Sequence, residues 1–288
     1  MRFEFIRAAK KAYPVTVLCR VLAVSRSGFY AWSRRPEPAR ALADRRARVA
    51  VRVAFVASRR QYGAPRIVRA LAPTGLRIGV KRAARLMRLE GLVARPRKQF
   101  RCTTNSRHDD PIAPNLVAQQ FTAPRPNHTW VADTTELCAG GARVFLAAVL
   151  DLFSRRIVGW ALARTNDADL TVTALNRALA HRRPRRGLVH HSDRGSTYTS
   201  RAVRRLLRQH KCRASMSGTG NCYDNAAMES WFSTLKTELG DTFSSVPAAH
   251  AALTDYIDMY YNQQRLHSTL DYVSPVTYER AAARPLAA

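Results

Sequence analysis

The stretch of sequence that decides the fold runs from His190 to Lys236. It begins His190-His191-Ser192-Asp193-Arg194-Gly195-Ser196-Thr197-Tyr198 and ends Met228-Glu229-Ser230-Trp231-Phe232-Ser233-Thr234-Leu235-Lys236. Asp193 follows the apolar run Gly187-Leu188-Val189, which is typical of a buried strand, and Glu229 lies in a segment with the apolar spacing of an amphipathic helix. The stretch therefore predicts one carboxylate at a strand end and a second on a helix, with 35 residues between them.

A third carboxylate, Asp133, interrupts the strand-like run Thr129-Trp130-Val131-Ala132-Asp133-Thr134-Thr135. An unpaired charge in such a run is costly to bury, which favours a function for it. Two Asp at strand ends and one Glu on a helix make a set of hard oxygen ligands suited to Mg²⁺, with Mn²⁺ as a substitute. Two such ions can promote attack on a phosphodiester. Lys236, seven residues after Glu229, either contacts a phosphate or is a solvated lysine.

Several nearby residues have competing interpretations. Asp151 and Glu136 are rival metal ligands because each lies at or near a strand. Asp224 is predicted as a helix N-cap. His190 and His191 could bind metal or act as a base, although a histidine within a strand is more often structural.

The pattern beyond Asn127 predicts an α/β core. Three strands in series are followed by alternating helices and strands, which is the order of a ribonuclease H-like fold with a mixed sheet and flanking helices. Strands are expected at Trp130–Asp133, Val144–Leu152, Ile157–Leu162, Leu188–Ser192 and Arg213–Ser217, and helices from Asp167 or Ala168 to His181, at Ser200–His210, at Asp224–Leu239 and at Ala248–Tyr261.

The first residues predict a helix-turn-helix-like module. Helices are expected at Phe3–Ala12 and Thr16–Leu22, and a third, capped by Ser25, runs to Ser33. Such a third helix can lie against DNA, while the alternative is a small bundle without groove contact. The expected core residues are Leu18, Val21, Leu22, Val24, Phe29 and Trp32.

A second helical module follows, with helices at Asp44–Ser58, from Pro65 or Arg66, and at Val80–Glu90, where Gly91 ends the last helix. Its last helix should bury Val80, Ala83, Ala84, Leu86, Met87 and Leu89. Clustered cations favour phosphate contact, although any one of them could simply be solvated. The predicted DNA contacts of the two modules are Arg26, Lys81, Arg82, Arg85, Arg88, Arg95, Arg97 and Lys98.

Charge is distributed unevenly between the helical front and the core. The 288-residue chain has 48 basic and 20 acidic residues, a net charge of +28, which predicts a polyanionic partner.

We divide the chain into a first module (1–38), a second module (39–104), a Pro-rich linker (105–126), a catalytic core (127–240), and a C-terminal helix and tail (241–288), with Pro275 starting the tail. The polar Tyr261–Leu270 loop has no function that its sequence explains.

Several classes of protein are disfavoured. The five cysteines form no CxxC pair, which argues against a disulfide framework or a cysteine zinc site. Neither a Walker-type loop nor a dinucleotide-binding glycine motif is present, and no Gly-x-Ser-x-Gly elbow supports a hydrolase triad. No apolar run approaches the ~20 residues of a membrane span. The expected location is the bacterial cytoplasm, in association with the nucleoid.

Several motifs, in order, resemble the OrfB product of insertion-sequence transposases of the IS-three group, relatives of retroviral integrases. They are Phe29-Tyr30-Ala31-Trp32, Tyr62-Gly63, Trp130-Val131-Ala132-Asp133-Thr134-Thr135, Ser192-Asp193-Arg194-Gly195-Ser196, Asp224-Asn225 with Glu229-Ser230, and Tyr261-Asn262 with Arg265 and His267-Ser268. Thr197 departs from the glutamine common in that group.

The resemblance implies a DDE transposase, a polynucleotidyl transferase with Asp133, Asp193 and Glu229 as ligands of two metal ions and with Lys236 beside them. It implies cleavage at the ends of an element and strand transfer by the freed 3′-hydroxyl. It also implies terminal repeats and target DNA as partners, self-association, and an upstream OrfA product, which can be joined to OrfB by a frameshift. The alternatives are a non-catalytic DNA-binding regulator derived from a transposase and a structure-selective nuclease on the same fold.

Overall fold

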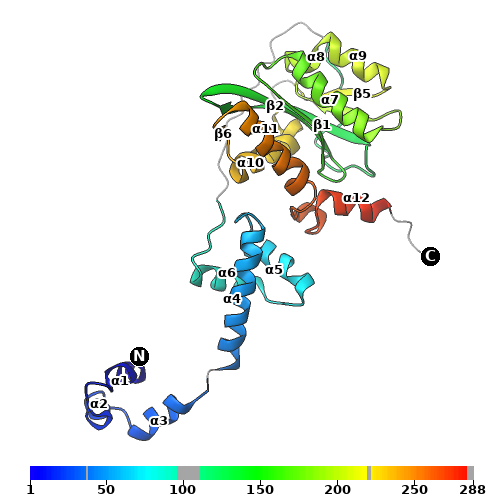
Figure 1. Ribbon diagram of the computed structural model, residues 1–288. Helices are drawn as coiled ribbons and strands as arrows, with labels where there is room; N and C mark the ends of the chain where they lie inside the picture. Colours follow the sequence, from blue (N-terminus) through cyan, green and yellow to red (C-terminus); the bar gives the residue numbers. More distant parts are fainter. Residues whose placement is uncertain (37, 96–110, 219–221, 284–288) are drawn as a thin grey trace, which may run out of the picture.

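The computed structural model describes residues 1–36, 38–95, 111–218 and 222–283. Along the chain it contains a three-helix module, a second helical module and an α/β core that carries the last helix (Figure 1). The predicted DNA contacts Arg97 and Lys98 lie outside the described residues.

One mixed sheet forms the centre of the core. Its strands are β1 (Thr129–Ala139), β2 (Ala142–Asp151), β3 (Ile157–Ala163), β4 (Val189–Ser192) and β5 (Arg213–Met216), in the order β3-β2-β1-β4-β5. The first three strands are antiparallel, whereas β4 and β5 run parallel to β1. A short strand, β6 (Thr242–Phe243), also pairs with β1. The predicted strands, the mixed sheet and the ribonuclease H-like order are thereby confirmed, and β6 was not predicted.

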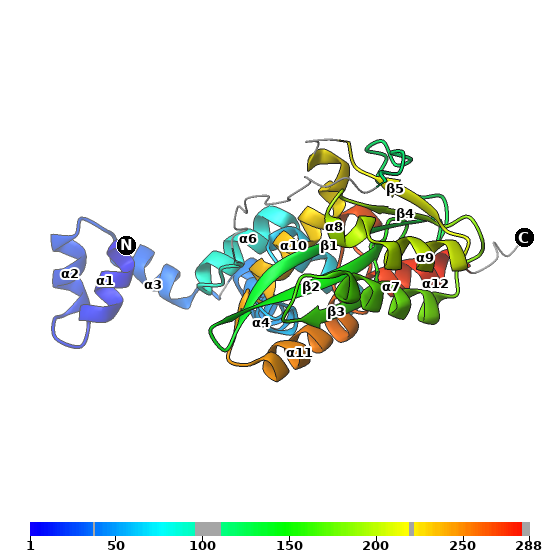
Figure 2. The same ribbon diagram turned by 90° about the horizontal axis from the view of Figure 1, so that it is seen from above.

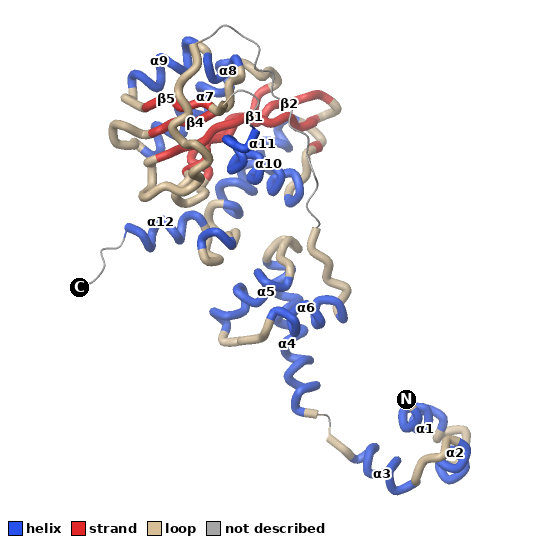
Figure 3. Tube along the Cα trace, turned by 180° about the vertical axis from the view of Figure 1, so that it is seen from behind, coloured by secondary structure: helices blue, strands red, loops and turns tan. Residues whose placement is uncertain are grey.

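The sheet has an apolar cluster on each face, because successive side chains of a strand point to opposite sides. Trp130 packs with α7 (Ala168–Arg182) and α9 (Arg201–Gln209) on one face. Val131 packs with α10 (Ala226–Glu238) and α11 (Val246–Thr254) on the other. These two helix layers enclose the sheet in Figure 1, and Figure 3 shows the strands between them from behind.

Close approach of α7 to the sheet depends on one glycine of β3. A Cβ atom on Gly159 would lie 2.4 Å from the carbonyl oxygen of Ala174 and 2.6 Å from the backbone nitrogen of Ala178. Any larger residue would push the helix away from the sheet. The helix begins at Ala168, one of the two predicted starts, and the Asp167 side chain caps it by accepting a hydrogen bond from the Leu170 N–H at 3.0 Å.

The first module consists of α1 (Arg2–Ala9), α2 (Val15–Val21) and α3 (Arg26–Arg34). Ser25 caps α3 as predicted, because its hydroxyl accepts from the Gly28 N–H at 3.0 Å. The expectation for Val21 was wrong: it is 75% exposed. The apolar face of α2 is centred near Leu18 and Cys19, about 100° around the helix from Val21. Ile6, which was not predicted, completes the buried centre.

The second module consists of α4 (Ala39–Ala57), α5 (Ala64–Leu71) and α6 (Val80–Leu89). Gly91, as predicted, takes the left-handed conformation that ends α6, with φ +64°. The expectations for Val80 and Leu89 were wrong, since they are 46% and 59% exposed. They occupy the two ends of α6, whereas its buried positions are Ala83, Leu86 and Met87.

The second module is bonded to the C-terminal part of the core. The Leu266 N–H donates to the Tyr62 hydroxyl at 2.8 Å, and the Tyr260 hydroxyl donates to the Ser58 carbonyl at 3.2 Å. Leu266 also packs against the apolar centre of the second module. The Tyr261–Leu270 loop thus joins two parts of the molecule, which its sequence did not reveal.

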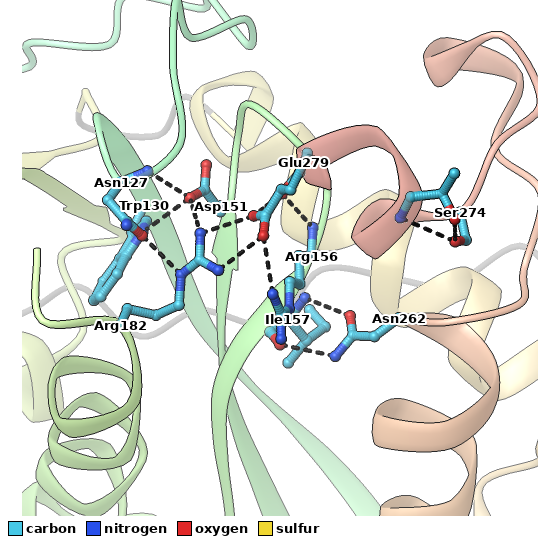
Figure 4. A network of polar contacts seen from close by, with 11 residues as sticks. Asn127, Trp130, Asp151, Arg156, Ile157, Arg182, Asn262, Ser274 and Glu279 are labelled. Atoms are coloured by element: carbon cyan, nitrogen blue, oxygen red, sulfur yellow. Dashed lines mark hydrogen bonds and ion pairs between the residues drawn. The ribbon is translucent and has the colours of Figure 1, made fainter. Parts of the chain in front are cut away.

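The C-terminal segment differs from the prediction. After α11 the chain continues as a π-helix (Asp255–Tyr261), and Pro275 begins another helix, α12 (Pro275–Ala283), rather than a tail. Proline suits the first turn of a helix because its missing N–H would have no helical partner there. Figure 4 shows why α12 stays on the core: Glu279 accepts hydrogen bonds from Arg156 and Arg182.

The described part of the predicted linker, residues 111–126, lies against the core. The Leu116 N–H donates to the Ser215 hydroxyl at 2.8 Å, and Val117 is 4% exposed within the core cluster. Residues 105–110 of that prediction lie outside the described residues.

Candidate active site

The predicted aspartates share one edge of the sheet. β1 and β4 are parallel with Val131 opposite His191, so Asp133 and Asp193 occupy matching positions two residues further on. β4 ends at Ser192, where β1 continues, and neighbouring strands lie about 4.8 Å apart. The sequence pattern had placed both residues at strand ends, whereas Asp133 lies within the eleven-residue β1.

Local backbone geometry orients both carboxylates. Asp133 Oδ1 accepts from the Thr134 N–H at 2.7 Å, and Asp193 Oδ1 accepts from the Gly195 N–H at 3.0 Å. A Cβ atom on Gly195 would lie 3.1 Å from Asp193 Oδ1, so a side chain there would crowd the carboxylate. Each aspartate therefore has an oxygen held by the chain and a fixed direction.

Glu229 belongs to the same electrostatic neighbourhood. It is exposed in the first turn of α10, on the side of the sheet opposite α7. Burial raises the pKa of Asp133 well above its ordinary value, and the negative charges of Asp193 and then Glu229 raise it further. Within the described ranges, no three His, Cys, Asp or Glu side chains are already gathered as a metal-binding group. The three carboxylates thus influence one another without forming a closed ligand cluster.

Tyr198 is a neighbour that sequence reasoning missed. It lies in the short helix α8 (Ser196–Thr199), is 5% exposed, and its hydroxyl is 3.4 Å from the Thr134 hydroxyl. Burial, and next the charge of Asp133, raise the pKa of Tyr198 well above its ordinary value. The phenol of Tyr198 therefore stays protonated. Its position directly after the Asp193 motif was the available signal.

The rival carboxylates have structural roles. Asp151 is fully buried and accepts hydrogen bonds from the Asn127 N–H, the Phe153 N–H and the Trp130 indole, with Arg182 3.6 Å away (Figure 4). Glu136 is half exposed and pairs with Arg143 at 3.7 Å.

The prediction for Asp224 was wrong, because Asn225 and not Asp224 precedes α10. Asp224 is buried in a 3₁₀ turn (Cys222–Asn225), where Oδ2 accepts from the Gly218 N–H at 2.7 Å and from Asn115 Nδ2 at 2.9 Å. It ties the segment after β5 to the segment before β1. Sequence spacing could not show this partner, which lies 109 residues away.

The two histidines are buried in β4. His191 Nδ1 is 2.9 Å from the Ser215 hydroxyl and Nε2 is 3.3 Å from the Ser217 hydroxyl. Burial lowers the pKa of His190 to about 4, with His191 contributing. These surroundings fit the structural interpretation of both side chains.

Lys236 lies on α10 two turns beyond Glu229 and is half buried. Burial lowers its pKa, which the nearby Asp241 and Glu136 counteract. Its surroundings are therefore acidic.

The predicted DNA contacts differ in their surroundings. Arg26, Lys81, Arg88 and Arg95 are exposed. Arg82 and Arg85 instead bind the two carboxylate oxygens of Asp44, with Arg82 Nη2 2.7 Å away. These two guanidiniums hold α6 against α4, so any phosphate contact would compete with Asp44.

No helix among the described residues is long and apolar enough to cross a membrane.

Comparison with known families matches three regions of the chain. One integrase core domain model covers residues 123–222, a second covers residues 210–275, and an HTH-like domain model covers residues 42–100. The "Insertion element IS600 uncharacterized 31 kDa protein" of Shigella sonnei is 40% identical over 263 residues, which is 91% of this chain and 97% of that protein. The "Transposase InsF for insertion sequence IS3A" of Escherichia coli (strain K12) is 36% identical over 293 aligned positions, 97% of this chain and 98% of that protein.

Solved structures of retroviral integrases are more distant. A chain of the simian T-cell lymphotropic virus intasome, in complex with PP2A regulatory subunit B56 gamma, is 18% identical with a TM-score of 0.48, covering 77% of this chain and 72% of that one. The HTLV-2 integrase catalytic core domain in complex with magnesium is 17% identical with a TM-score of 0.41, covering 54% of this chain and 98% of that one.

Proposed function

This chain belongs to the IS3 family of insertion-sequence transposases, and on that premise we propose that Asp133, Asp193 and Glu229 form the site where it cleaves and joins DNA. The single observation that carries the assignment is the register of β1 and β4, which sets two aspartates side by side. Besides burial and the charge of Asp193, the negative charge of Glu229 also raises the pKa of Asp133. The chain thus acts as a polynucleotidyl transferase through these three residues.

The donor set suits a hard divalent cation, and we assign it to two Mg²⁺ ions, for which Mn²⁺ can substitute. Asp133 is half-buried and lies near the like charges of Asp193 and Glu229, which is a neighbourhood that cations would stabilise. When bound, such ions supply activation of the attacking oxygen and neutralisation of the leaving oxygen. Asp133 and Asp193 would hold them from fixed backbone positions, and Glu229 would reach them from α10.

The remaining chemistry consists of positioning. In cleavage, water attacks the phosphorus and the bond to the 3′-oxygen at the element end breaks. In joining, that 3′-oxygen attacks a target phosphodiester, a new P–O bond forms, and a 3′-oxygen of the target leaves. Gly195 leaves room beside Asp193, and the protonated Tyr198 supports the strand that carries Asp133.

DNA is the partner, consistent with the HTH-like match and the basic charge. We propose that terminal repeats and target DNA both reach the carboxylate edge while the exposed Arg26, Lys81, Arg88 and Arg95 contact phosphates. Lys236 is proposed as a phosphate contact on α10. Self-association, an upstream OrfA product and location at the bacterial nucleoid complete the proposal. The division of the chain into modules at residues 38, 104, 126 and 240 also belongs to this proposal.

The test uses a duplex that carries the terminal sequence of the element, incubated with Mg²⁺ or Mn²⁺. Asp193→Asn and Glu229→Gln should each reduce cleavage and joining about a thousandfold or more while DNA binding in EDTA persists. Glu136→Gln is the matched control, because Glu136 is an exposed carboxylate of the same strand as Asp133. Undiminished activity in both site variants would refute the assignment. Hydrolysis without joining would instead indicate a nuclease, and binding without turnover a regulator.

A further inference from the structure

The Tyr261–Leu270 loop closes one side of a cavity beside α10. Arg265 of this loop forms a buried ion pair with Glu238, the last residue of α10, through Nη2 at 2.8 Å and Nε at 3.0 Å. Glu238 also accepts from the Tyr256 hydroxyl at 2.8 Å. Burial by itself would lower the pKa of Arg265, but the attraction and hydrogen bonds of Glu238 raise it. This pair is therefore complete, and Glu238 is committed to it.

Three parts of the chain enclose the cavity, whose volume is about 560 Å³. The second module contributes Arg66 and Arg95, the β2–β3 turn contributes Arg155, and α10 contributes the face that includes Ser230. Ser268 and Thr269 of the loop are exposed at its edge, so the cavity can be reached from the surface.

Charge in this cavity is unbalanced. Four arginines line it, whereas Glu238 is the one carboxylate among its lining residues. Within the described part of the chain, neither Arg66 nor Arg155 has an ion-pair partner within 4.0 Å. Arg66 lies over the Tyr62 ring at 5.7 Å, and Arg155 Nη2 donates to the Phe121 carbonyl at 2.8 Å.

Burial and the excess of positive charge lower the pKa values of His267 and Arg66. Burial, followed by the charges of Arg265, Arg66 and Arg155, lowers the pKa of His267 to about 2. Burial lowers the pKa of Arg66, and Arg265 lowers it further; burial also lowers the pKa of Arg155. The guanidiniums of Arg66 and Arg265 are thus close enough to repel each other, and neither Arg66 nor Arg155 has a carboxylate partner in the described chain.

The backbone of Arg155 adopts an energetically unfavourable conformation. Its φ of +61° lies in the left-handed region, which is unfavourable for a residue with a side chain. The Asp151 carbonyl accepts from the Arg155 N–H at 2.8 Å and holds this turn. This turn and the hydrogen bond to the Phe121 carbonyl together fix Arg155 at the cavity wall.

We propose that this cavity binds a backbone phosphate of the DNA on which the carboxylate site acts, through Arg66 and Arg155. The proposal rests on the proposed function and deepens it. Planar guanidiniums suit the geometry of phosphate oxygens, and the hydroxyls of Ser268 and Thr269 can donate to them. Loss of water from two partly buried cations is compensated only when an anion arrives, so the cavity favours phosphate over uncharged ligands.

The position on α10 relates this phosphate to the reaction. The α10 residues that line the cavity include Ala226 and Ala227 before Glu229 and Ser230 directly after it, and the wall ends at Glu238. α10 therefore carries both Glu229 and one wall of the cavity. A phosphate in the cavity would belong to the same stretch of DNA as the phosphate at the carboxylates.

The test compares Arg66→Gln, Arg155→Gln and the double variant with Arg69→Gln in the full-length protein. Arg69 is the matched control: it lies one turn from Arg66 on α5, stacks on the Tyr272 ring at 5.0 Å, and is absent from the cavity wall. Binding of a 30-base-pair duplex is measured in EDTA over a range of salt concentrations, so that no catalysis is needed. The slope of log K against log[salt] should fall by about one in the double variant and stay unchanged in Arg69→Gln.

A second measurement separates DNA phosphate from free phosphate. Inorganic phosphate, at an ionic strength matched with chloride, should raise the melting temperature of the wild type and of Arg69→Gln more than that of the double variant. Stabilisation by phosphate with an unchanged DNA slope would overturn the proposal in favour of a free-anion site. No effect in either measurement would also overturn it.

The wild type and the single variants keep the test decisive if the double variant does not fold. A wild type that phosphate stabilises no more than chloride does, together with single variants of unchanged salt slope, would refute the site. Failure of strand transfer would refute the proposed function, whereas this EDTA-based binding assay would still report on the cavity.

Discussion

The two helical modules before the core are both basic, but they differ in how they are attached to it. The first, Arg2–Arg34, packs around Ile6 and Phe29, and among the described residues its polar and ring contacts all stay within it. The second is bonded to the core through Tyr62, Gln61 and Arg59. Figure 2 shows the first module lying apart from the rest.

The difference teaches that basic charge alone does not position a module. A DNA contact on α6 has a defined direction relative to Asp133 and Asp193, because buried hydrogen bonds link its module to the core. A contact on α3 has no such link among the described residues. We therefore expect the second module to set where DNA meets the carboxylates, and the first to add affinity without fixing the register.

Breaking the ion pair between Arg265 and Glu238, which holds the loop that bonds Tyr62 of the second module, should give the largest effect. Arg265→Met leaves the Glu238 carboxylate buried without its partner, which should reduce the free energy of unfolding by about 3–5 kcal/mol. The side chains of Arg265 and Glu238 are 6% and 7% exposed. Chemical denaturation followed by tryptophan fluorescence measures the change.

The control for that prediction is Arg59→Met, at an exposed ion pair that links the second module to Asp255 of the core. The Arg59 and Asp255 side chains are 39% and 56% exposed, so this change should cost about 1 kcal/mol or less. Equal losses in the two variants would show that burial of the Arg265–Glu238 pair does not add to stability.

Acid should lower the free energy of unfolding of the core through His267. The helical modules lack such a contribution, because the first 107 residues of the chain contain no histidine. The pKa of His267 is about 2 in the folded protein and near 6.5 when unfolded, so below pH 6.5 the unfolded chain binds a proton that the folded chain does not. Stability is therefore lost as pH falls below 6.5, by roughly 2 kcal/mol at pH 5. The comparison of wild type with His267→Gln at pH 7, 6 and 5 isolates this contribution from those of the carboxylates. Parallel pH profiles would contradict it.

Loss of the Ser25 cap should give the smallest and most local effect. Ser25→Ala removes the hydroxyl that accepts from the Gly28 N–H, at a cost of about 1 kcal/mol. Hydrogen exchange should accelerate about fivefold for amides of α3 and stay unchanged in α5 and β1. Ser200→Ala, which removes the cap of α9, should instead affect the core. Faster exchange of β1 after Ser25→Ala would mean that the modules are coupled.

Much of the fold could be predicted from local pattern. Strands around Asp133 and Asp193, the helix of Glu229, and the caps at Ser25 and Asp167 depend on residues close in sequence. Local pattern could not show partners that are distant in sequence. Asp224 serves Asn115 and Gly218 rather than a helix end, and the pairing of Arg82 and Arg85 with Asp44 was likewise not visible in the spacing.

The amino-acid sequence by itself determined the order of strands and helices and the basic front, because periodicity, caps and charge are properties of short segments. Only the tertiary structure decided that Asp133 and Asp193 share a register, that Asp151 is structural, and that Arg66, Arg155 and the Tyr261–Leu270 loop surround one cavity. These relations join residues up to 204 positions apart. They depend on which surfaces pack together, and no local spacing encodes that.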